Sequence, residues 1–372
     1  MFGFSTLTTL LVLVSAAVAD TMLAAVYTPG HYKVVLDPAF PVPTPGEGQV
    51  LLKVAACGIC HSDVFYLSAA RPDPRTYILG HEIVGTPAQL GPGVSNISLT
   101  QLYGVYLVDL TQPDPLHFST GTGLDGGYAE FVLVNQGQLV PVPDGLAPEI
   151  AALASDSLVT AFKAVNNVAQ VTTGDRVLIY GVGGLGHQAV QLALHLGATV
   201  FAVDLRPEAR QLALDLGAEQ AFDLEDLTAV TGNGTFHVDK VIDFVATVQS
   251  FELSKAAVAL TVSEGIDGLA NPGRIVIVGF SADSLSFASA DLIAANIAVS
   301  SSTYGSQDDM RSSLDLLAQK TGFFQGVIRP NVTVVALEDI NTALDALKAH
   351  EVTGRMVVVP GLNSTAGTNG RR

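Results

Sequence analysis

Cys60 and His81 lie 21 positions apart, in two short motifs rich in residue types that bind metal ions. The motifs read CGICHSD at positions 57–63 and GHEIVG at positions 80–85. Thiolate, imidazole and carboxylate are the ligands that zinc takes in catalytic sites, where one coordination position stays open for substrate. The two motifs therefore predict a catalytic zinc ion, and beside a dinucleotide site such an ion would polarise an alcohol or carbonyl oxygen during hydride transfer.

A glycine-rich loop, GVGGLG, has the pattern of a dinucleotide site. It follows an apolar run that begins at residue 176, and it precedes a segment with helical spacing. In this pattern the first glycine permits a tight turn, the second lets the backbone approach a pyrophosphate, and the third lets helix and strand pack closely. The N-terminus of the helix supplies N–H groups for the phosphates. The predicted cofactor-binding residues of the loop are Gly181, Gly183, Gly184, Leu185 and Gly186.

An acidic residue, Asp204, ends the next apolar run, 18 residues after Gly186. A carboxylate at this point accepts hydrogen bonds from the ribose hydroxyls and repels a 2′-phosphate, which favours NAD over NADP. Arg206 and Arg210 lie close by, and arginine is the residue that accommodates a 2′-phosphate, so NADP is the less favoured alternative. The structural alternative is a glycine turn followed by a solvated aspartate.

The elements that must position these residues change in character near residue 151. Before it, short strand-like runs alternate with glycine and proline, which indicates a β-rich domain. After it, buried strand-like runs alternate with helix-like runs, which predicts an α/β domain with a doubly wound parallel sheet. The strand-like runs are 176–182, 199–205, 238–246 and 273–280, and the helix-like runs include 156–169, 185–198, 207–218, 311–319 and 340–350.

Length and composition limit the class of protein. A chain of 372 residues fits two domains. The net charge of −17 argues against nucleic acid and against an anionic membrane surface as partners. Only two cysteines, Cys57 and Cys60, are present, which excludes a disulfide-stapled scaffold and a four-cysteine structural zinc site.

The N-terminus has the pattern of a secretory signal peptide. Residues 5–18 are apolar and uncharged, and Ala17-Val18-Ala19 forms a small-x-small cleavage site before Asp20. The apolar run is too short for a membrane span. Four N-x-Ser/Thr sequons, at Asn96, Asn233, Asn331 and Asn363, favour entry into the secretory pathway and a glycosylated, secreted protein. The leader lacks Lys and Arg, so the alternative is a cytoplasmic protein that starts at Met22.

The order and spacing of the motifs resemble those of the zinc-dependent medium-chain alcohol dehydrogenases. The motifs are CGICHSD, GHEIVG, DGGYAEF at 125–131, GVGGLGH at 181–187 and GRMVVV at 354–359. The resemblance runs from Met22 to about Pro360 and implies a GroES-like catalytic domain, built from both ends of the chain, around an inserted Rossmann domain. The expected divisions are a signal peptide over 1–19, the catalytic domain over 20–155, the NAD-binding domain over 156–306, and a return to the catalytic domain over 307–372.

The resemblance also implies a set of metal ligands. Cys60 and His81 match the first two ligands of the catalytic zinc. Many members of the family place a third ligand, a cysteine, before the Rossmann unit, where this chain has Asp156. A carboxylate is an acceptable zinc ligand, which makes Asp156 the expected third one. The alternative is that Asp156 only caps the helix that follows it.

Five further residues receive roles from the same resemblance. Ser62 matches the hydroxyl that contacts the alcohol oxygen, and Asp63 matches the acid that orients the ligand histidine. Glu82 matches the acid that lies behind the metal and can transiently ligate it. His61 and Arg355 match residues that approach the cofactor phosphates.

The expected reaction is reversible hydride transfer between NAD and a small alcohol, aldehyde or ketone, by an enzyme acting on CH–OH groups. The expected metal content is one catalytic zinc per chain and no structural zinc, because the segment 95–124 holds no cysteine. Where family members have a structural zinc lobe, it often supports subunit contacts. Because this chain lacks the lobe, the sequence does not decide whether the protein forms a homo-oligomer. Two alternatives remain: a zinc-free quinone or enoyl reductase of the same superfamily, and a non-catalytic, secreted nucleotide-binding protein. Cys57 is expected to be a small buried residue, although a Cys57–Cys60 disulfide would compete with zinc.

Overall fold

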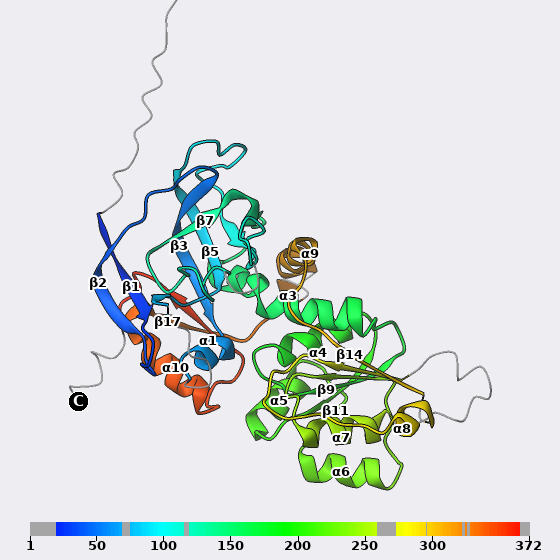
Figure 1. Cartoon of the computed structure of the whole chain (residues 1–372). Helices are drawn as coiled ribbons and strands as arrows, with labels where there is room; N and C mark the ends of the chain where they lie inside the picture. Colours follow the sequence, from blue (N-terminus) through cyan, green and yellow to red (C-terminus); the bar gives the residue numbers. More distant parts are fainter. Residues whose placement is uncertain are drawn as a thin grey trace, which may run out of the picture.

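The computed structural model describes residues 20–68, 75–114, 119–258, 273–294, 296–321, 324–325 and 328–364. Figure 1 shows two parts: a β-rich part that contains both ends of the described chain, and a part with a parallel sheet, drawn in green to yellow. The predicted leader, residues 1–19, lies outside the described residues. No helix among those described is both long enough and apolar enough to span a membrane.

The β-rich part is organised around a seven-stranded sheet that joins distant segments of the chain. Its order is β17-β18-β3-β5-β6-β8, and β7 also pairs with β3. β18 runs antiparallel to β3, with Met356 opposite Ile59 and Val357 opposite Gly58, so the C-terminal segment completes a sheet begun near the N-terminus. The strands are β3 (Gln49–Ile59), β5 (Glu82–Leu90), β6 (Tyr103–Val105), β7 (Phe131–Asn135), β8 (Leu139–Pro141), β17 (Val332–Ala336) and β18 (Arg355–Val359).

A smaller sheet and several helices complete this part. Three strands pair in the order β2-β1-β4: β1 (Thr21–Tyr27), β2 (Val35–Pro41) and β4 (Tyr77–Ile78). The helices are α1 (His61–Tyr66), η1 (Gln136–Gln138), α2 (Pro148–Ala151), η5 (Leu337–Asp339) and α10 (Ile340–Lys348). α1 begins directly where β3 ends, which places the residues of the CGICHSD motif at a strand-to-helix junction.

The second part contains the predicted parallel sheet. Its order is β11-β10-β9-β12-β13-β14, and every pairing is parallel. This is the doubly wound order in which the first strand lies beside the fourth, and ligands bind at the carboxyl ends of the strands near that switch point. The strands are β9 (Arg176–Tyr180), β10 (Thr199–Val203), β11 (Gln220–Phe222), β12 (Lys240–Asp243), β13 (Gly273–Ile277) and β14 (Ile297–Ser301). The helices are α4 (Gly186–His195), α5 (Pro207–Asp215), α6 (Leu224–Gly232), α7 (Val248–Ala257) and α8 (Ser289–Ala294).

The two parts share a hydrophobic core. One cluster of buried residues contains Val84 of β5 and Val357 of β18 together with Val177 of β9 and Val190 of α4. Helical segments bridge the parts: η2 (Ala152–Ser155), α3 (Ser157–Phe162), the π-helix η3 (Lys163–Val168) and α9 (Gln307–Ala318). A short hairpin of β15 (Lys320–Thr321) and β16 (Phe324–Gln325) follows α9. The predicted helix over 156–169 is therefore divided, and Asp156 lies at the break between η2 and α3.

A charged contact at the amino end of the parallel sheet yields a prediction. Asp175 accepts hydrogen bonds from the backbone N–H and hydroxyl of Thr172 and pairs with Lys240. Burial alone would raise the pKa of Asp175, but these partners outweigh it and lower the pKa. Asp175→Asn is expected to lower the free energy of unfolding by about 1 kcal/mol at neutral pH.

The sign of the pH dependence follows from that lowered pKa. Asp175 contributes to the free energy of unfolding above its unfolded-state pKa of about 4. This contribution is lost as the pH falls through the lower pKa of the folded state. Urea unfolding of Asp175→Asn and the native chain between neutral and acidic pH checks this, with the exposed Asp215→Asn as control. A stability difference that stayed constant down to the most acid pH would contradict it.

Candidate metal and dinucleotide site

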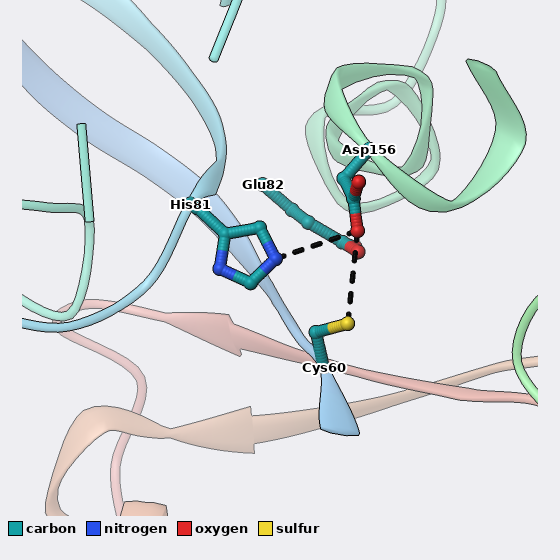
Figure 2. A group of neighbouring side chains, drawn as sticks. All are labelled: Cys60, His81, Glu82 and Asp156. Carbon is teal, nitrogen blue, oxygen red and sulfur yellow. Dashed lines mark hydrogen bonds and ion pairs between the residues drawn. The ribbon is translucent and has the colours of Figure 1, made fainter. Parts of the chain in front are cut away.

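Four side chains that can hold a metal ion meet where the two parts join. The ligand atoms of Cys60, His81, Glu82 and Asp156 lie within 4.8 Å of one another. Figure 2 shows the thiol, the imidazole and the carboxylate of Asp156 pointing toward the same small volume. They come from three elements: the end of β3, the start of β5 and the break before α3. The structure thus brings together the three predicted zinc ligands.

Cys60 is held at the junction of β3 and α1. Its backbone N–H donates to Asp63 Oδ2 at 2.9 Å, and its Sγ lies 3.6 Å from Asp156 Oδ2 and 3.5 Å from Ser62 Oγ. Burial alone would raise the pKa of the thiol, but the charge of Arg355 and the hydrogen bond with His81 outweigh it and lower the pKa. A lowered pKa favours the thiolate, which is the form that binds metal.

His81 is buried, with 3% of its surface exposed, between two carboxylates. Nδ1 lies 3.3 Å from Asp63 Oδ1, and Nε2 lies 3.4 Å from Asp156 Oδ2. A histidine that ligates metal through one nitrogen is commonly oriented by a carboxylate at the other. The ring therefore has the surroundings of a ligand that faces a cation with Nε2 and is oriented from behind by Asp63.

The carboxylate of Asp156 does not act as a helix cap. Asp156 occupies the N-cap position of α3, but its side chain makes no capping hydrogen bond to the backbone. Oδ1 accepts from the hydroxyl of Thr160 at 3.3 Å, and Oδ2 faces Cys60 and His81. Burial raises the pKa of Asp156, but His81 and Arg355 outweigh it and hold the pKa far below its usual value. The group is thus an ionised carboxylate aimed at the other two ligands.

The donor set fits zinc. A buried thiol, an imidazole and a carboxylate form a mixed S/N/O set of the kind that holds catalytic zinc, and the Glu82 carboxylate lies in the same cluster. Soft thiolate and imidazole donors do not suit magnesium or calcium, which prefer oxygen ligands.

Glu82 and Arg355 form a buried ion pair behind the ligand cluster. Glu82 is fully buried and Arg355 is 3% exposed; Arg355 Nη2 pairs with Glu82 Oε1, and Nε donates to Oε2 at 3.3 Å. Burial lowers the pKa of Arg355, but the charges of Glu82, Cys60 and Asp156 outweigh it and raise the pKa. Burial also raises the pKa of Glu82 well above its usual value, and the charge of Arg355 opposes that shift. A Cβ atom on Gly58 would collide with the Glu82 carboxylate, so the adjacent strand has room only for glycine.

Arg355 also connects the ligand cluster to the glycine loop. A Cβ atom on Gly184 would lie 2.5 Å from Arg355 Nη1, which shows that the guanidinium packs directly against the loop. Arg355 therefore lies beside the loop for which a phosphate contact is predicted, and the phosphate contact itself stays a prediction. The main partner of its charge in the structure is nevertheless Glu82.

The glycine loop has the shape that a dinucleotide requires. Gly181 has a φ of +88°, which permits the tight turn. A Cβ atom on Gly183 would meet nothing within 4 Å, so the backbone is open to a ligand there. A Cβ atom on Gly186 would collide with the carbonyl of Gly181, so helix and loop pack as closely as predicted. Leu185 is the N-cap of α4, so the N–H groups of the first turn of α4 follow the loop directly.

Asp204 lies beside this loop and is connected to it. Oδ2 accepts from the backbone N–H of Val182 at 2.8 Å, and Oδ1 accepts from that of Arg206 at 2.9 Å. The two neighbouring guanidinium groups are engaged by backbone carbonyls. Arg206 Nη1 donates to His350 and Val352 at 3.1 and 2.6 Å, and Arg210 Nη1 donates to the carbonyls of Asp204 and Leu205, each at 2.9 Å.

The remaining predicted residues lie on α1. Ser62 is exposed, and its hydroxyl is next to the thiol of Cys60. The ring of His61 stacks on that of His350, with centroids 5.5 Å apart. His61 is exposed by its accessible surface, but desolvation by the surrounding chain, together with Arg355 and His350, lowers its pKa to about 4.

Tyr128 is a residue of the site that sequence reasoning missed. Its hydroxyl donates to Asp63 Oδ2 at 2.6 Å, so it supports the acid that orients His81. Its ring fills the space beside Gly80, where a Cβ atom would lie 2.5 Å away. The signal was available, because Tyr128 is the tyrosine of the DGGYAEF motif.

Cys57 faces the core of the β-rich part, and burial raises the pKa of its thiol. Both cysteines are free thiols.

Comparisons with known proteins agree with this architecture. Residues 46–144 match the profile described as "Alcohol dehydrogenase GroES-like domain", and residues 184–319 match "Zinc-binding dehydrogenase". An alcohol dehydrogenase of Geobacillus stearothermophilus is 32% identical over 329 residues, which are 84% of this chain and 91% of that protein. An alcohol dehydrogenase of Moraxella sp. (strain TAE123) is 27% identical and covers 85% of this chain and 93% of its own length.

Solved structures give the same result. The acetophenone reductase of Geotrichum candidum NBRC 4597, in complex with NAD, matches with a TM-score of 0.78 at 28% identity, over 92% of this chain and 98% of its own. The alcohol dehydrogenase of Aeropyrum pernix matches with a TM-score of 0.77 at 25% identity, over 91% of this chain and 100% of its own. The chain belongs to the zinc-dependent medium-chain alcohol dehydrogenase family of oxidoreductases. The predicted family, and the predicted GroES-like and Rossmann fold, are confirmed.

Proposed function

We propose that this protein is a zinc- and NAD-dependent alcohol dehydrogenase that interconverts small alcohols with aldehydes or ketones. The observation that carries the proposal is the cluster of Cys60, His81 and Asp156, joined through Arg355 to an open glycine loop. Further support comes from relatives named alcohol dehydrogenases and from a structural neighbour in complex with NAD.

The residues of the site divide the chemistry among them. When bound, a zinc ion held by Cys60, His81 and Asp156 would supply a Lewis acid for the substrate oxygen, and the nicotinamide would accept hydride. Ser62 Oγ receives the proton of the substrate hydroxyl and passes it toward solvent, to which Ser62 is exposed. Asp63 keeps the His81 ring oriented. Glu82 balances the charge of Arg355 behind the ligands.

An activity panel tests the proposal. The chain beginning at Asp20, loaded with zinc, is assayed with NAD and primary and secondary alcohols, and in reverse with aldehydes and ketones. NADH formation that needs zinc supports the proposal. NAD binding without turnover on the panel would favour the non-catalytic alternative. Metal-independent reduction of activated double bonds would favour the zinc-free reductase.

Asp204 is proposed to select NAD over NADP. Its carboxylate lies beside the loop, with Oδ1 3.6 Å from Arg206 Nε, and Nη1 of each nearby arginine already donates to backbone carbonyls. Part of the charge that a 2′-phosphate would need is therefore already engaged. Asp204→Ala is expected to lower kcat/KM for NAD by about tenfold or more, the effect of losing a charged hydrogen bond to a ribose hydroxyl. NADP turnover should change little or improve. A matched fall with both cofactors would show that Asp204 only supports the loop through Val182. The exposed Glu208→Ala is the control.

We also propose that the catalytic domain spans 20–155 and 307–372 and that the NAD-binding domain spans 156–306.

We propose further that residues 1–19 direct the chain into the secretory pathway. Two sequons are suited to a glycan. Asn96 is exposed in a loop, and exposed Asn233 follows α6, where its Oδ1 accepts from the Thr235 hydroxyl at 2.6 Å. Asn331 is exposed as well, but its Nδ2 donates to the carbonyl of Thr353 at 3.3 Å and its backbone N–H donates to His187 Nε2.

Expression of the full chain in a secreting eukaryotic host checks this proposal. Removal of the leader before Asp20 and N-glycans at Asn96 and Asn233, with Asn331 unmodified, are the expected results. The measurement is peptide mass spectrometry after enzymatic deglycosylation in heavy-oxygen water. Retention of an unglycosylated chain in the cytoplasm would favour the alternative start at Met22. The sequon at Asn363 ends at residue 365, outside the described residues.

The proposed metal content is one catalytic zinc per chain without a structural zinc. The two cysteines of the chain both lie in the CGICHSD motif, so no cysteine remains for a second site. A homo-oligomer is compatible with a chain that lacks a structural zinc. Light scattering coupled to gel filtration measures the oligomeric state directly.

A further inference from the structure

Tyr304 lies between the carboxyl end of the parallel sheet and the backbone next to Asp156 of the ligand cluster. It belongs to the loop between β14 and α9, which follows the carboxyl end of the last parallel strand. This is the edge of the sheet at which dinucleotides bind in such folds. Its φ of +41° is a left-handed conformation that few aromatic residues adopt, so the surroundings must hold it in place.

The hydroxyl of Tyr304 provides that hold through two hydrogen bonds. It donates to the carbonyl of Ser155 at 2.7 Å and accepts from the backbone N–H of Leu107 at 2.8 Å. Ser155 immediately precedes Asp156, so one of these bonds ends on the residue adjoining the carboxylate that faces Cys60 and His81.

The same segment is fixed from its other side. Ser155 Oγ donates to the carbonyl of Ile83 at 3.0 Å, and Ile83 belongs to β5, which also carries Glu82. Ser155 is therefore held between β5 and the loop of Tyr304. Neither bond involves the Asp156 side chain, which is left to the ligand cluster and to Thr160.

Close packing keeps this loop against α3. A Cβ atom on Gly305 would collide with Cγ2 of Val159, so the loop backbone lies directly on the helix that begins after Asp156. The ring of Tyr106 packs on that of Tyr304, with centroids 5.3 Å apart, and its hydroxyl donates to the carbonyl of Gly305 at 3.1 Å. The hydroxyl of Tyr106 thus bonds to the same loop, whereas the bond to the Ser155 carbonyl comes from Tyr304.

We propose that Tyr304 is a positioning residue that fixes the backbone at Asp156, so that the carboxylate is set for metal binding. The inference rests on the proposed metal site and adds a residue that the sequence motifs do not identify. Partners that orient metal ligands from behind typically contribute 10–100-fold to metal affinity or activity. A tyrosine that only joined two loops would contribute to stability alone.

Two isosteric variants separate these roles. Tyr304→Phe removes the bonds to Ser155 and Leu107 and keeps the ring. Tyr106→Phe, the matched control, removes one hydroxyl bond to the same loop and leaves Ser155 untouched. Zinc affinity is measured on the metal-free proteins by competition with a chromophoric chelator, and thermal unfolding of the same metal-free proteins records stability.

The expected result is zinc binding about tenfold or more weaker in Tyr304→Phe, and unchanged in Tyr106→Phe. A second readout is the visible spectrum of the cobalt-substituted proteins. Its ligand-field bands should shift in Tyr304→Phe and match the native protein in Tyr106→Phe, because cobalt absorption reports coordination geometry.

Three outcomes would overturn the proposal: equal zinc affinity in both variants, an unchanged cobalt spectrum in Tyr304→Phe, or a metal-free Tyr304→Phe that fails to fold. The last would show that the hydroxyl serves the fold. Failure of the underlying metal site is distinguishable, because the native chain itself would then bind no zinc.

Discussion

Replacing Asp156 with asparagine is expected to lower kcat/KM for alcohol oxidation by about 10³-fold, because a Lewis acid contributes several kcal/mol and 1.36 kcal/mol is tenfold in rate. Asparagine keeps the volume of the side chain and its contact with Thr160, but it removes the charge that faces Cys60 and His81. Zinc content, measured by elemental mass spectrometry, should fall together with turnover.

The control for this variant is Asp144→Asn, which makes the same chemical change on an exposed loop. It should leave zinc content and turnover unchanged. If Asp156→Asn also kept both, Asp156 would be a structural residue at the start of α3, and the third ligand would have to be another group.

Replacing Arg355 with methionine is expected to lower the free energy of unfolding of the metal-free protein by about 3–5 kcal/mol, the usual effect of removing one partner of a buried ion pair. The reason is that Glu82 is fully buried, and burial already raises its pKa. Without Arg355, Glu82 would lose the opposite charge that favours its ionised form. Chemical denaturation with urea, followed by circular dichroism, measures this change.

Two further variants define the origin of the loss. The double variant Glu82→Gln with Arg355→Met should recover much of it, because no charge is then left unpaired. Arg311→Met removes an arginine from an exposed pair with Asp308 and should have little measurable effect. A double variant no more stable than Arg355→Met would show that the arginine acts through packing, for example against Gly184, and not through its charge.

The sequence was most informative where chemistry is local. Three motifs each lie at a single junction of a strand with a helix or loop: CGICHSD, GHEIVG and the glycine loop. Within each motif, the spacing alone places the side chains close together. The predicted strands and helices of the parallel sheet agree with β9, β10, β12, β13, α4 and α5 to within a few residues. Long apolar runs bounded by glycine are strong signals, because both faces of a parallel sheet are buried.

Weaker patterns were missed for physical reasons. α1 is only six residues long, too short for a helical period to show, and α6 and α7 were not predicted. The helix expected over 156–169 is divided into α3 and a π-helix, and its preceding break aims Asp156 at the cluster. Amphipathic periodicity carries no information about such a break.

Contacts between distant residues lie beyond a single sequence. Glu82 and Arg355 are separated by 273 positions, and Ser155 and Tyr304 by 149. From the sequence, Arg355 is expected near the cofactor phosphates and Glu82 behind the metal. Only the folded structure shows that the two residues form an ion pair. Tyr304 belongs to no motif, and its role depends on which carbonyl its hydroxyl reaches.

Zinc content measured together with turnover, on protein beginning at Asp20, tests the central claim most directly. The account predicts about one zinc per chain. It also predicts that a chelated, metal-free protein neither oxidises alcohols with NAD nor reduces the corresponding carbonyls, and that one equivalent of zinc restores both reactions. Full turnover by a protein with no zinc, or zinc binding that persists when Cys60, His81 and Asp156 are all replaced, would contradict it.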